Sequence, residues 1–359
     1  MTHNNLAGLK REDFQKTING KPTDLFILKN KNGMEIAVTN YGAATLAIMM
    51  PDKNGNYSNV ILGHDSIDNV VNSPEPFLST TIGRYGNRIA KGKFTLCGKE
   101  YSLTINNGPN SLHGGPTGFH AVVWDAEQKD EQTVEFKYTA KDGEEGFPGN
   151  LDVIMTYSLT DENEFKIDYK AKTDKTTIVN LTNHGFFNLA GITNPTPTVL
   201  NNILTINADH YTPIDNVCIP FGEIAKVEGT PLDFRAPHLV GDRINDKHQQ
   251  IENGAGYDHC FVLNKKEAGE LSFAVKCIEP NSGRYMEMYT TEPGVQLYTG
   301  NWLNGFSGAH GATFPARSAI CFEAQHFPDT PNNPYFPSAT LHPGEEYSQI
   351  TVYKFGVEK

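Results

Sequence analysis

The chain has 359 residues, of which 38% are hydrophobic and 20% charged, and its formal net charge at pH 7 is −12. This length allows two average domains or one large β domain, and such a chain needs no disulfide or metal to complete its core. The negative charge argues against nucleic acid and against an anionic membrane surface as partners, because both are bound through lysine and arginine. A neutral small molecule such as a sugar stays open as a ligand.

The start of the chain, residues 1–24, is interpreted as a tail and a leading segment, followed by a single domain over residues 25–359. Its first residues, Met-Thr-His-Asn-Asn-Leu, form a polar stretch overall, and no apolar h-region precedes Leu25. This pattern predicts no signal peptide, and no later apolar run approaches the length of a membrane span. We therefore expect a cytoplasmic protein, although removal of a leader before periplasmic export would leave the same sequence.

Strand signals dominate the first half of the chain. Asn32-Gly33 lies between the apolar runs 25–29 and 34–38, and Asn54-Gly55 follows another such run. Asn and Gly tolerate positive φ, so both pairs indicate hairpin turns. Apolar and polar residues alternate over 152–159 and again over 165–171, which predicts a further β-hairpin.

The second half continues in the same way, with many short strands and few helical patterns. Residues 238–252 are the best candidate for a short helix. Further strand-like runs lie at 133–139, 178–181, 260–263, 271–278, 285–289, 295–298, 319–323 and 349–355. No flexible linker or repeat interrupts them. The sequence therefore predicts an all-β protein built as one large antiparallel β-sandwich.

The five cysteines are odd in number and form no Cys-x-x-Cys pair. Most of them lie beside apolar residues in strand-like runs, which is typical of buried free thiols in a reducing compartment. A catalytic thiolate has no local support in the sequence. The cysteines are Cys97, Cys218, Cys260, Cys277 and Cys321.

Two glycine-rich segments carry polar side chains suited to a small ligand. In 83–89, Asn87 and Arg88 offer amide and guanidinium donors for hydroxyl oxygens. In 107–115, His113 precedes two glycines, which let the backbone approach a ligand closely. The alternative for both segments is an ordinary surface turn with solvated side chains.

Two strand-like runs end on groups that can transfer protons. His184 follows an apolar run and precedes a glycine, and an imidazole titrates near neutral pH. Glu323 ends another apolar run, where partial desolvation would raise its pKa and make it a stronger base. The alternatives are a histidine bonded to a backbone carbonyl and a glutamate that faces water.

Two smaller pieces add hydroxyl-binding candidates. Asp258 precedes the strand-like run at 260–263, and Gln296 lies within the run at 295–298. Each could accept or donate hydrogen bonds to sugar hydroxyls. Taken alone, each is more often part of a turn or of a solvated face.

In this order along the chain, these segments resemble the aldose 1-epimerase family, also called galactose mutarotase. The similarity extends from about Leu25 to the C-terminus, and six ordered motifs are far more specific than one. The six matching pieces are 87–89, 112–115, 182–189, 258–259, 295–301 and 323–329. The C-terminal piece 343–347 also resembles the family.

The resemblance implies the family's antiparallel β supersandwich and a reaction that interconverts the α and β anomers of a free hexose such as galactose or glucose. It implies Glu323 as the general base, His184 as the general acid and His113 as a helper at the ring oxygen. Neither a cofactor nor a metal is implied, and the partner is a monosaccharide, bound by a monomer or homodimer. The residues implied to hold hydroxyls are Asn87, Arg88, Asp258 and Gln296.

The chemistry agrees, because mutarotation breaks no bond to carbon-bound hydrogen and needs only one acid and one base. The sequence has no dinucleotide fingerprint in a βαβ unit and no P-loop. Rival enzymes are a glycoside hydrolase using Glu323 and Asp258, and a hexose-phosphate epimerase, for which Arg88 is the one arginine in a matched motif. A metal site at His113, His184 and Glu323 and a sugar-binding module without catalysis are further alternatives.

Overall fold

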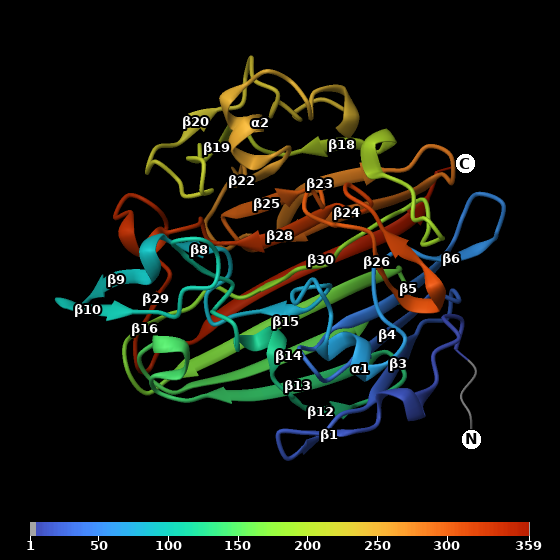
Figure 1. The fold of residues 1–359 in the computed structure, drawn as a ribbon, viewed down its shortest axis with the longest axis horizontal. Coiled ribbons are helices and arrows are strands. Elements are labelled where there is room, and N and C mark those ends of the chain that lie inside the picture. Colours follow the sequence, from blue (N-terminus) through green and yellow to red (C-terminus); the bar gives the residue numbers. More distant parts are fainter. Residues whose placement is uncertain (1–4, 359) are drawn as a thin grey trace.

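The computed structural model describes residues 5–358, and its largest element is a nine-stranded sheet that runs the length of the molecule (Figure 1). The C-terminal strand β30 lies near the middle of this sheet, paired with β15 on one side and β24 on the other. In sheet order the strands are β12 (Asp125–Gln128), β13 (Thr133–Ala140), β14 (Leu151–Leu159), β15 (Glu164–Thr173), β30 (Tyr347–Val357), β24 (Arg284–Thr290), β23 (Ser272–Ile278), β18 (Ile203–Ile206) and β21 (His238–Leu239).

A five-stranded sheet packs on this large sheet and supports the candidate site. Its order is β20 (Ala225–Lys226), β19 (His210–Tyr211), β22 (Asp258–Val262), β25 (Gly294–Tyr298) and β28 (Cys321–Gln325). Buried residues of both sheets, among them Phe322 and Tyr353, share one hydrophobic core. The Tyr353 hydroxyl also donates a hydrogen bond to the Phe322 carbonyl at 2.8 Å, which ties the layers together.

The N-terminal part of the chain, blue in Figure 1, forms a four-stranded sheet of β3 (Leu25–Lys29), β4 (Glu35–Thr39), β5 (Thr45–Pro51) and β6 (Tyr57–Asn59). Leu9 and Phe14 are buried in a cluster with Leu25 and Ala37, so the segment before β3 packs against this sheet. The boundary at residue 25 stays a prediction.

Short strand pairs and turns connect the sheets. The pairs are β1–β2 (Thr17–Ile18, Lys21–Pro22), β7–β17 (Thr81–Ile82, Thr182–Asn183), β8–β11 (Arg88–Ile89, Ser111–Leu112), β9–β10 (Lys93–Leu96, Lys99–Ser102), β16–β29 (Thr177–Ile178, Thr340–Leu341) and β26–β27 (Phe306–Ser307, Thr313–Phe314). The α-helices are α1 (Ile67–Val71) and α2 (Gln249–Gly254). The 3-10 turns are Arg11–Phe14, Ala90–Gly92, Phe119–Ala121, Glu144–Gly146, Val199–Asn201, Val240–Asp242, Ala309–Gly311 and Thr330–Asn332. Over residues 5–358, the helices lack the length and apolar character needed to cross a bilayer.

The predicted all-β antiparallel sandwich is confirmed, and so are the hairpins at Asn32-Gly33, at Asn54-Gly55 and between β14 and β15. The helix expected over 238–252 is wrong in extent, because its first residues pair with β18 and only Gln249–Gly254 is α-helical.

The cysteine prediction needs a correction. All five thiols are free, but only three are buried, while Cys97 is exposed and Cys218 is half-buried. Cys97 has φ +51° and precedes Gly98 in the turn between β9 and β10, so its place is set by the turn and not by a strand interior.

Candidate active site

The five-stranded sheet places three predicted residues on one face. Glu323 on β28 lies opposite Gln296 on β25, and Gln296 lies opposite Cys260 on β22. Asp258 is two residues before Cys260, so its side chain leaves the sheet on the same side. Glu323, Gln296 and Asp258 are only 2%, 3% and 7% exposed. Together they form a buried polar surface in an otherwise apolar layer.

His184 reaches this surface from β17. Its N–H donates to the Thr80 carbonyl at 2.9 Å, which continues the pairing between β17 and β7. Its Nε2 lies 3.5 Å from Oε1 of Glu323. In the described part of the chain, neither Nδ1 of His184 nor Oε2 of Glu323 has a hydrogen-bond partner. Each member of this buried pair therefore has one hydrogen-bonding atom that is available to a ligand.

His113 lies beside His184, with ring centroids 5.0 Å apart. It adopts φ +53°, and Asn87 holds it twice: the His113 N–H donates to the Asn87 carbonyl, and the Asn87 N–H donates to Nδ1 of His113, both at 3.0 Å. Because Nδ1 accepts this hydrogen bond, a neutral His113 carries its ring proton on Nε2. The ring is thereby set as a hydrogen-bond donor.

Arg88 and its partners form the other end of the site. The Arg88 Nε donates to Asn107 Oδ1 at 3.0 Å, and Nη1 lies 3.7 Å from Asp258 Oδ2. Gln296 Nε2 donates to Asp258 Oδ1 at 2.7 Å. The side-chain oxygen of Asn87 accepts the Arg88 N–H at 2.8 Å. The structure thus brings together all seven predicted residues in one constellation.

Burial sets the proton affinities of the acid–base pair. It raises the pKa of Glu323 well above its ordinary value, with Asp258 and Glu75 adding to the effect and Arg88 opposing it. Burial lowers the pKa of His184 to about 3 and that of His113 well below its ordinary value. These directions favour a protonated Glu323 beside a neutral His184.

One ligand atom from each of His113, His184 and Glu323 lies within 4.8 Å of the others, so the spacing alone would accept a metal ion. The donor set fits a metal poorly. A metal on Nε2 of His113 would need the ring proton on Nδ1. Nδ1 already accepts the Asn87 N–H at 3.0 Å. The hydrogen-bonding state therefore favours a proton-transfer site over a metal site.

The segment 73–80, which borders the site, was not among the predicted site segments. Phe77 of this segment packs on the ring of His113 at a centroid distance of 4.7 Å. Outside the segment, Asn107 was also not predicted as a site residue, and its Oδ1 accepts the hydrogen bond that orients Arg88. Burial raises the pKa of Glu75 to about 7. Pro74 and Pro76 around a single carboxylate were the available signal, but they indicate only a rigid loop.

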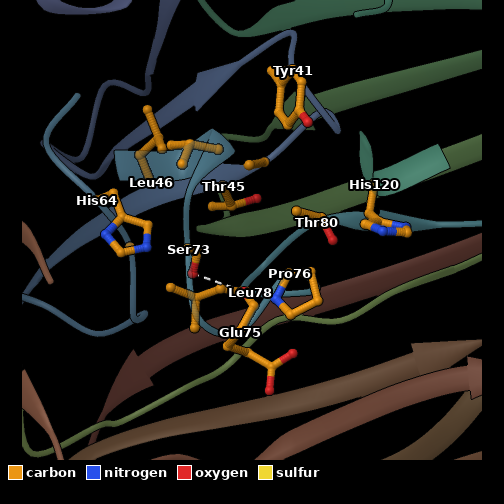
Figure 2. Close-up of a pocket in the computed structure, with 13 residues that line it drawn as sticks. Tyr41, Thr45, Leu46, His64, Ser73, Glu75, Pro76, Leu78, Thr80 and His120 are labelled. Carbon is orange, nitrogen blue, oxygen red and sulfur yellow. Dashed lines mark hydrogen bonds between the residues drawn. The ribbon is translucent and has the colours of Figure 1, made fainter. Parts of the chain in front are cut away.

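Figure 2 shows a cavity behind this segment, lined by His64, Glu75, Thr80 and His120 among others. Its volume is about 10 Å³, enough for about one water molecule and far too small for a hexose. None of the seven predicted site residues lines it. The cavity is thus a neighbour of the candidate site and not the sugar site itself.

Together, the fold and the site define a class of protein: an antiparallel β-sandwich that carries a buried carboxyl–imidazole pair beside a cluster of polar side chains. A family model described as aldose 1-epimerase matches residues 24–354. Galactose mutarotase from Bos taurus is 45% identical over 325 residues, covering 90% of this chain and 92% of the relative. Aldose 1-epimerase from Escherichia coli K12 is 36% identical over 343 residues, covering 94% and 97%.

Solved structures agree with these relatives. An aldose epimerase homologue from C. elegans superposes with a TM-score of 0.86 at 29% identity, covering 94% of this chain and 100% of that one. Galactose 1-epimerase from Lactobacillus acidophilus gives 0.83 at 30% identity, covering 96% and 97%. This chain belongs to the aldose 1-epimerase family.

Proposed function

We propose that this aldose 1-epimerase interconverts the α and β anomers of free aldohexoses, galactose and glucose among them, by general acid–base catalysis. One observation carries the proposal. Nε2 of His184 lies 3.5 Å from Oε1 of Glu323 in a buried site, and each side chain keeps one atom free of protein partners over the described residues. A hemiacetal needs a base at the C1 hydroxyl and an acid at the ring oxygen, and this pair supplies both.

In the forward direction, the Glu323 carboxylate takes the proton from O1. The electrons of that O–H bond form the C1=O1 double bond, the C1–O5 bond breaks, and O5 takes a proton from the His184 imidazolium. The product is the open-chain aldehyde, with Glu323 protonated and His184 neutral. This is the protonation state that the pKa directions of the two groups favour.

The aldehyde then rotates about C1–C2 and closes on its other face. His184 takes the proton back from the O5 hydroxyl, O5 attacks C1, and Glu323 returns a proton to O1. No proton is gained or lost over the cycle. The two forms of the pair differ only in the position of one proton: ring opening starts from the form with the proton on His184, and ring closure starts from the form with the proton on Glu323.

The neighbouring groups have supporting roles. His113 donates its Nε2–H to the ring oxygen, a role consistent with the Asn87 N–H that occupies its Nδ1. Asn87, Arg88, Asp258 and Gln296 hold the distal hydroxyls while C1 turns, the Arg88 fork being the strongest donor.

The proposal includes a cofactor-free and metal-free enzyme that acts as a monomer or homodimer in the cytoplasm. Light scattering after size-exclusion chromatography reports the oligomer. Elemental analysis with a chelator control tests the metal, since activity lost on chelation would contradict this part.

The direct test is polarimetry of freshly dissolved α-D-galactose and α-D-glucose at neutral pH. Protein should accelerate the approach to equilibrium rotation in proportion to its concentration. A rate equal to that of buffer would refute the proposed function. Hydrolysis of a nitrophenyl glycoside would instead favour a glycosidase with Glu323 and Asp258 as its carboxylates.

A further inference from the structure

Phe77 lies among three histidine rings at the edge of the active site. Its ring centroid is 4.7 Å from that of His113 and 4.6 Å from that of His120, with edge-on geometry in both pairs. It is nearly parallel to the ring of His184, with 17° between the planes and 6.3 Å between centroids. These separations are in the range of favourable aromatic contacts. A single half-buried side chain therefore contacts both imidazoles of the proposed mechanism.

The backbone around Phe77 is held by local hydrogen bonds. The Phe77 N–H donates to the Glu75 carboxylate at 3.2 Å, and the Ser73 hydroxyl donates to the Glu75 carbonyl at 2.8 Å. The Phe77 carbonyl accepts from the Thr80 N–H and hydroxyl at 3.3 and 3.1 Å. Pro74 and Pro76 restrict the remaining backbone freedom. The loop thus presents the ring of Phe77 in a fixed place.

The same segment also holds the main chain of His184. The His184 N–H donates to the Thr80 carbonyl at 2.9 Å, and Thr81 pairs with Asn183 in the β7–β17 ladder. A catalytic histidine is commonly oriented by a hydrogen bond on its second ring nitrogen. Here, Nδ1 of His184 has no such partner among the described residues. The orientation of its ring therefore depends on packing together with the approach of Nε2 to Oε1 of Glu323 at 3.5 Å.

The rings that pack on His184 are Phe186 at 4.8 Å, His113 at 5.0 Å, Tyr298 at 6.2 Å and Phe77 at 6.3 Å between centroids. Phe186 and Tyr298 belong to the hydrophobic cluster beneath the site. Phe77 is different because it comes from a loop, is half-buried and contacts His113 as well. It is placed to fix the two imidazoles relative to each other.

We propose that Phe77 is a positioning residue for the epimerase reaction, whose ring holds the imidazoles of His184 and His113 in the geometry needed for proton transfer at the ring oxygen. This inference rests on the proposed function. It assigns no proton transfer to Phe77. Loss of the ring should slow the chemical step more than it weakens sugar binding.

The test compares Phe77→Leu with Phe77→Tyr by polarimetry over a range of α-D-galactose concentrations. Phe77→Leu should lower kcat roughly 10- to 100-fold, because small misplacement of catalytic groups has effects of this size, while KM changes less than about threefold. Phe77→Tyr keeps the ring and should retain most of the wild-type kcat. Phe306→Leu is the matched control, since Phe306 is also partly buried and packs at 6.2 Å on a histidine outside the site, His64.

Each outcome decides. If Phe77→Leu keeps the wild-type kcat, whether or not its KM rises, the positioning role is overturned. The proposed function stays intact in that case, because the wild-type protein is still active. An equal loss in Phe306→Leu would also overturn it, because the effect would then be general. Circular dichroism and thermal unfolding report folding. If Phe77→Leu fails to fold, Phe77→Met replaces it, and failure of both to fold would show that Phe77 serves overall stability instead.

Discussion

Oε1 of Glu323 and Nε2 of His184 lie 3.5 Å apart, with both side chains almost fully buried. At this distance the two groups titrate as one unit, so the pair is best described by how many protons it holds. Burial disfavours both charged forms, and it raises the pKa of Glu323 while lowering that of His184. The pair therefore keeps one proton over a wide pH range, and the sugar decides on which member it lies.

Glu323→Gln tests the base. The amide has nearly the same shape and removes the proton acceptor, so kcat for galactose should fall roughly 10²- to 10⁴-fold with little change in KM. Thermal unfolding should show that the fold is intact. Glu287→Gln on β24, where the carboxylate lies 3.7 Å from Lys276 Nζ, is the control and should keep full activity. Activity near the wild-type level in Glu323→Gln would refute the base assignment.

His184→Asn tests the acid. Asparagine can still donate a hydrogen bond but cannot deliver a proton, so the loss in kcat should again be roughly 10²- to 10⁴-fold. The control is His310→Asn, at an exposed histidine that bonds the Ala7 carbonyl at 2.7 Å. If His184→Asn keeps more than a third of the activity, another group must protonate the ring oxygen.

The pH dependence follows from the one-proton pair. Activity should be lost at low pH only when a second proton enters, near the His184 pKa of about 3, and at high pH only when the proton leaves Glu323, whose pKa is raised well above its ordinary value. Polarimetric kcat should therefore be flat through the ordinary histidine pKa of about 6.5. A steep acid limb near pH 6.5 would contradict the shared proton.

Much of the fold was predictable because one face of many strands is buried. The strands β14 and β15 alternate cleanly between buried and exposed residues, and their hairpin was predicted from that period. The run 178–181 was wrongly treated as one strand. Its backbone donors go to separate segments, Val179 to the Ala339 carbonyl and Asn180 to the Arg84 carbonyl, and alternation cannot reveal partners so distant in sequence.

The site was predictable to a different degree. Glu323 and His184 end apolar runs and lie in ordered motifs, so both are identified from the sequence. The register of β25 and β28 places Glu323 opposite Gln296, and the approach of β17 to β28 brings His184 to Glu323. Phe77 was not identified. A single aromatic residue in a proline-rich loop gives no periodic signal, and its role depends on three histidines brought together by the fold.

His64→Leu should change the pH dependence of stability. Burial lowers the pKa of His64 to about 4, and over residues 5–358 neither ring nitrogen has a hydrogen-bond partner. The unfolded chain, with an ordinary pKa near 6.5, then binds one more proton between these values. Between these two pKa values, this histidine therefore lowers the free energy of unfolding by about 1.4 kcal/mol for each unit by which the pH falls.

Urea unfolding at pH 7 and pH 5 measures this effect. From pH 7 to pH 5, the free energy of unfolding of the wild type should fall by about 2 kcal/mol more than that of His64→Leu, because the other groups contribute equally to both proteins. Equal losses would show that His64 is solvated or paired in solution. His64 lies on the cavity of Figure 2 and outside the proposed catalytic set, so activity at pH 7 should persist.

Charge predicts discrimination against phosphorylated sugars. The Asp258 carboxylate lies in the site region, where Nη1 of Arg88 lies 3.7 Å from its Oδ2 and Nε of Arg88 donates to Asn107. A hexose 6-phosphate would bring up to two further negative charges toward the Asp258 carboxylate, and the Arg88 guanidinium beside it is already paired with that carboxylate. Its kcat/KM should be at least ~100-fold below that of galactose, since like-charge contacts cost several kcal/mol.

Polarimetry of both sugars with Asp258→Asn separates the effect of charge from that of shape. This variant should lose activity on galactose, because a hydroxyl acceptor is weakened. The ratio of kcat/KM for galactose to kcat/KM for the 6-phosphate should nevertheless become smaller than in the wild type. A 6-phosphate that reacts faster than galactose would instead identify a sugar-phosphate epimerase.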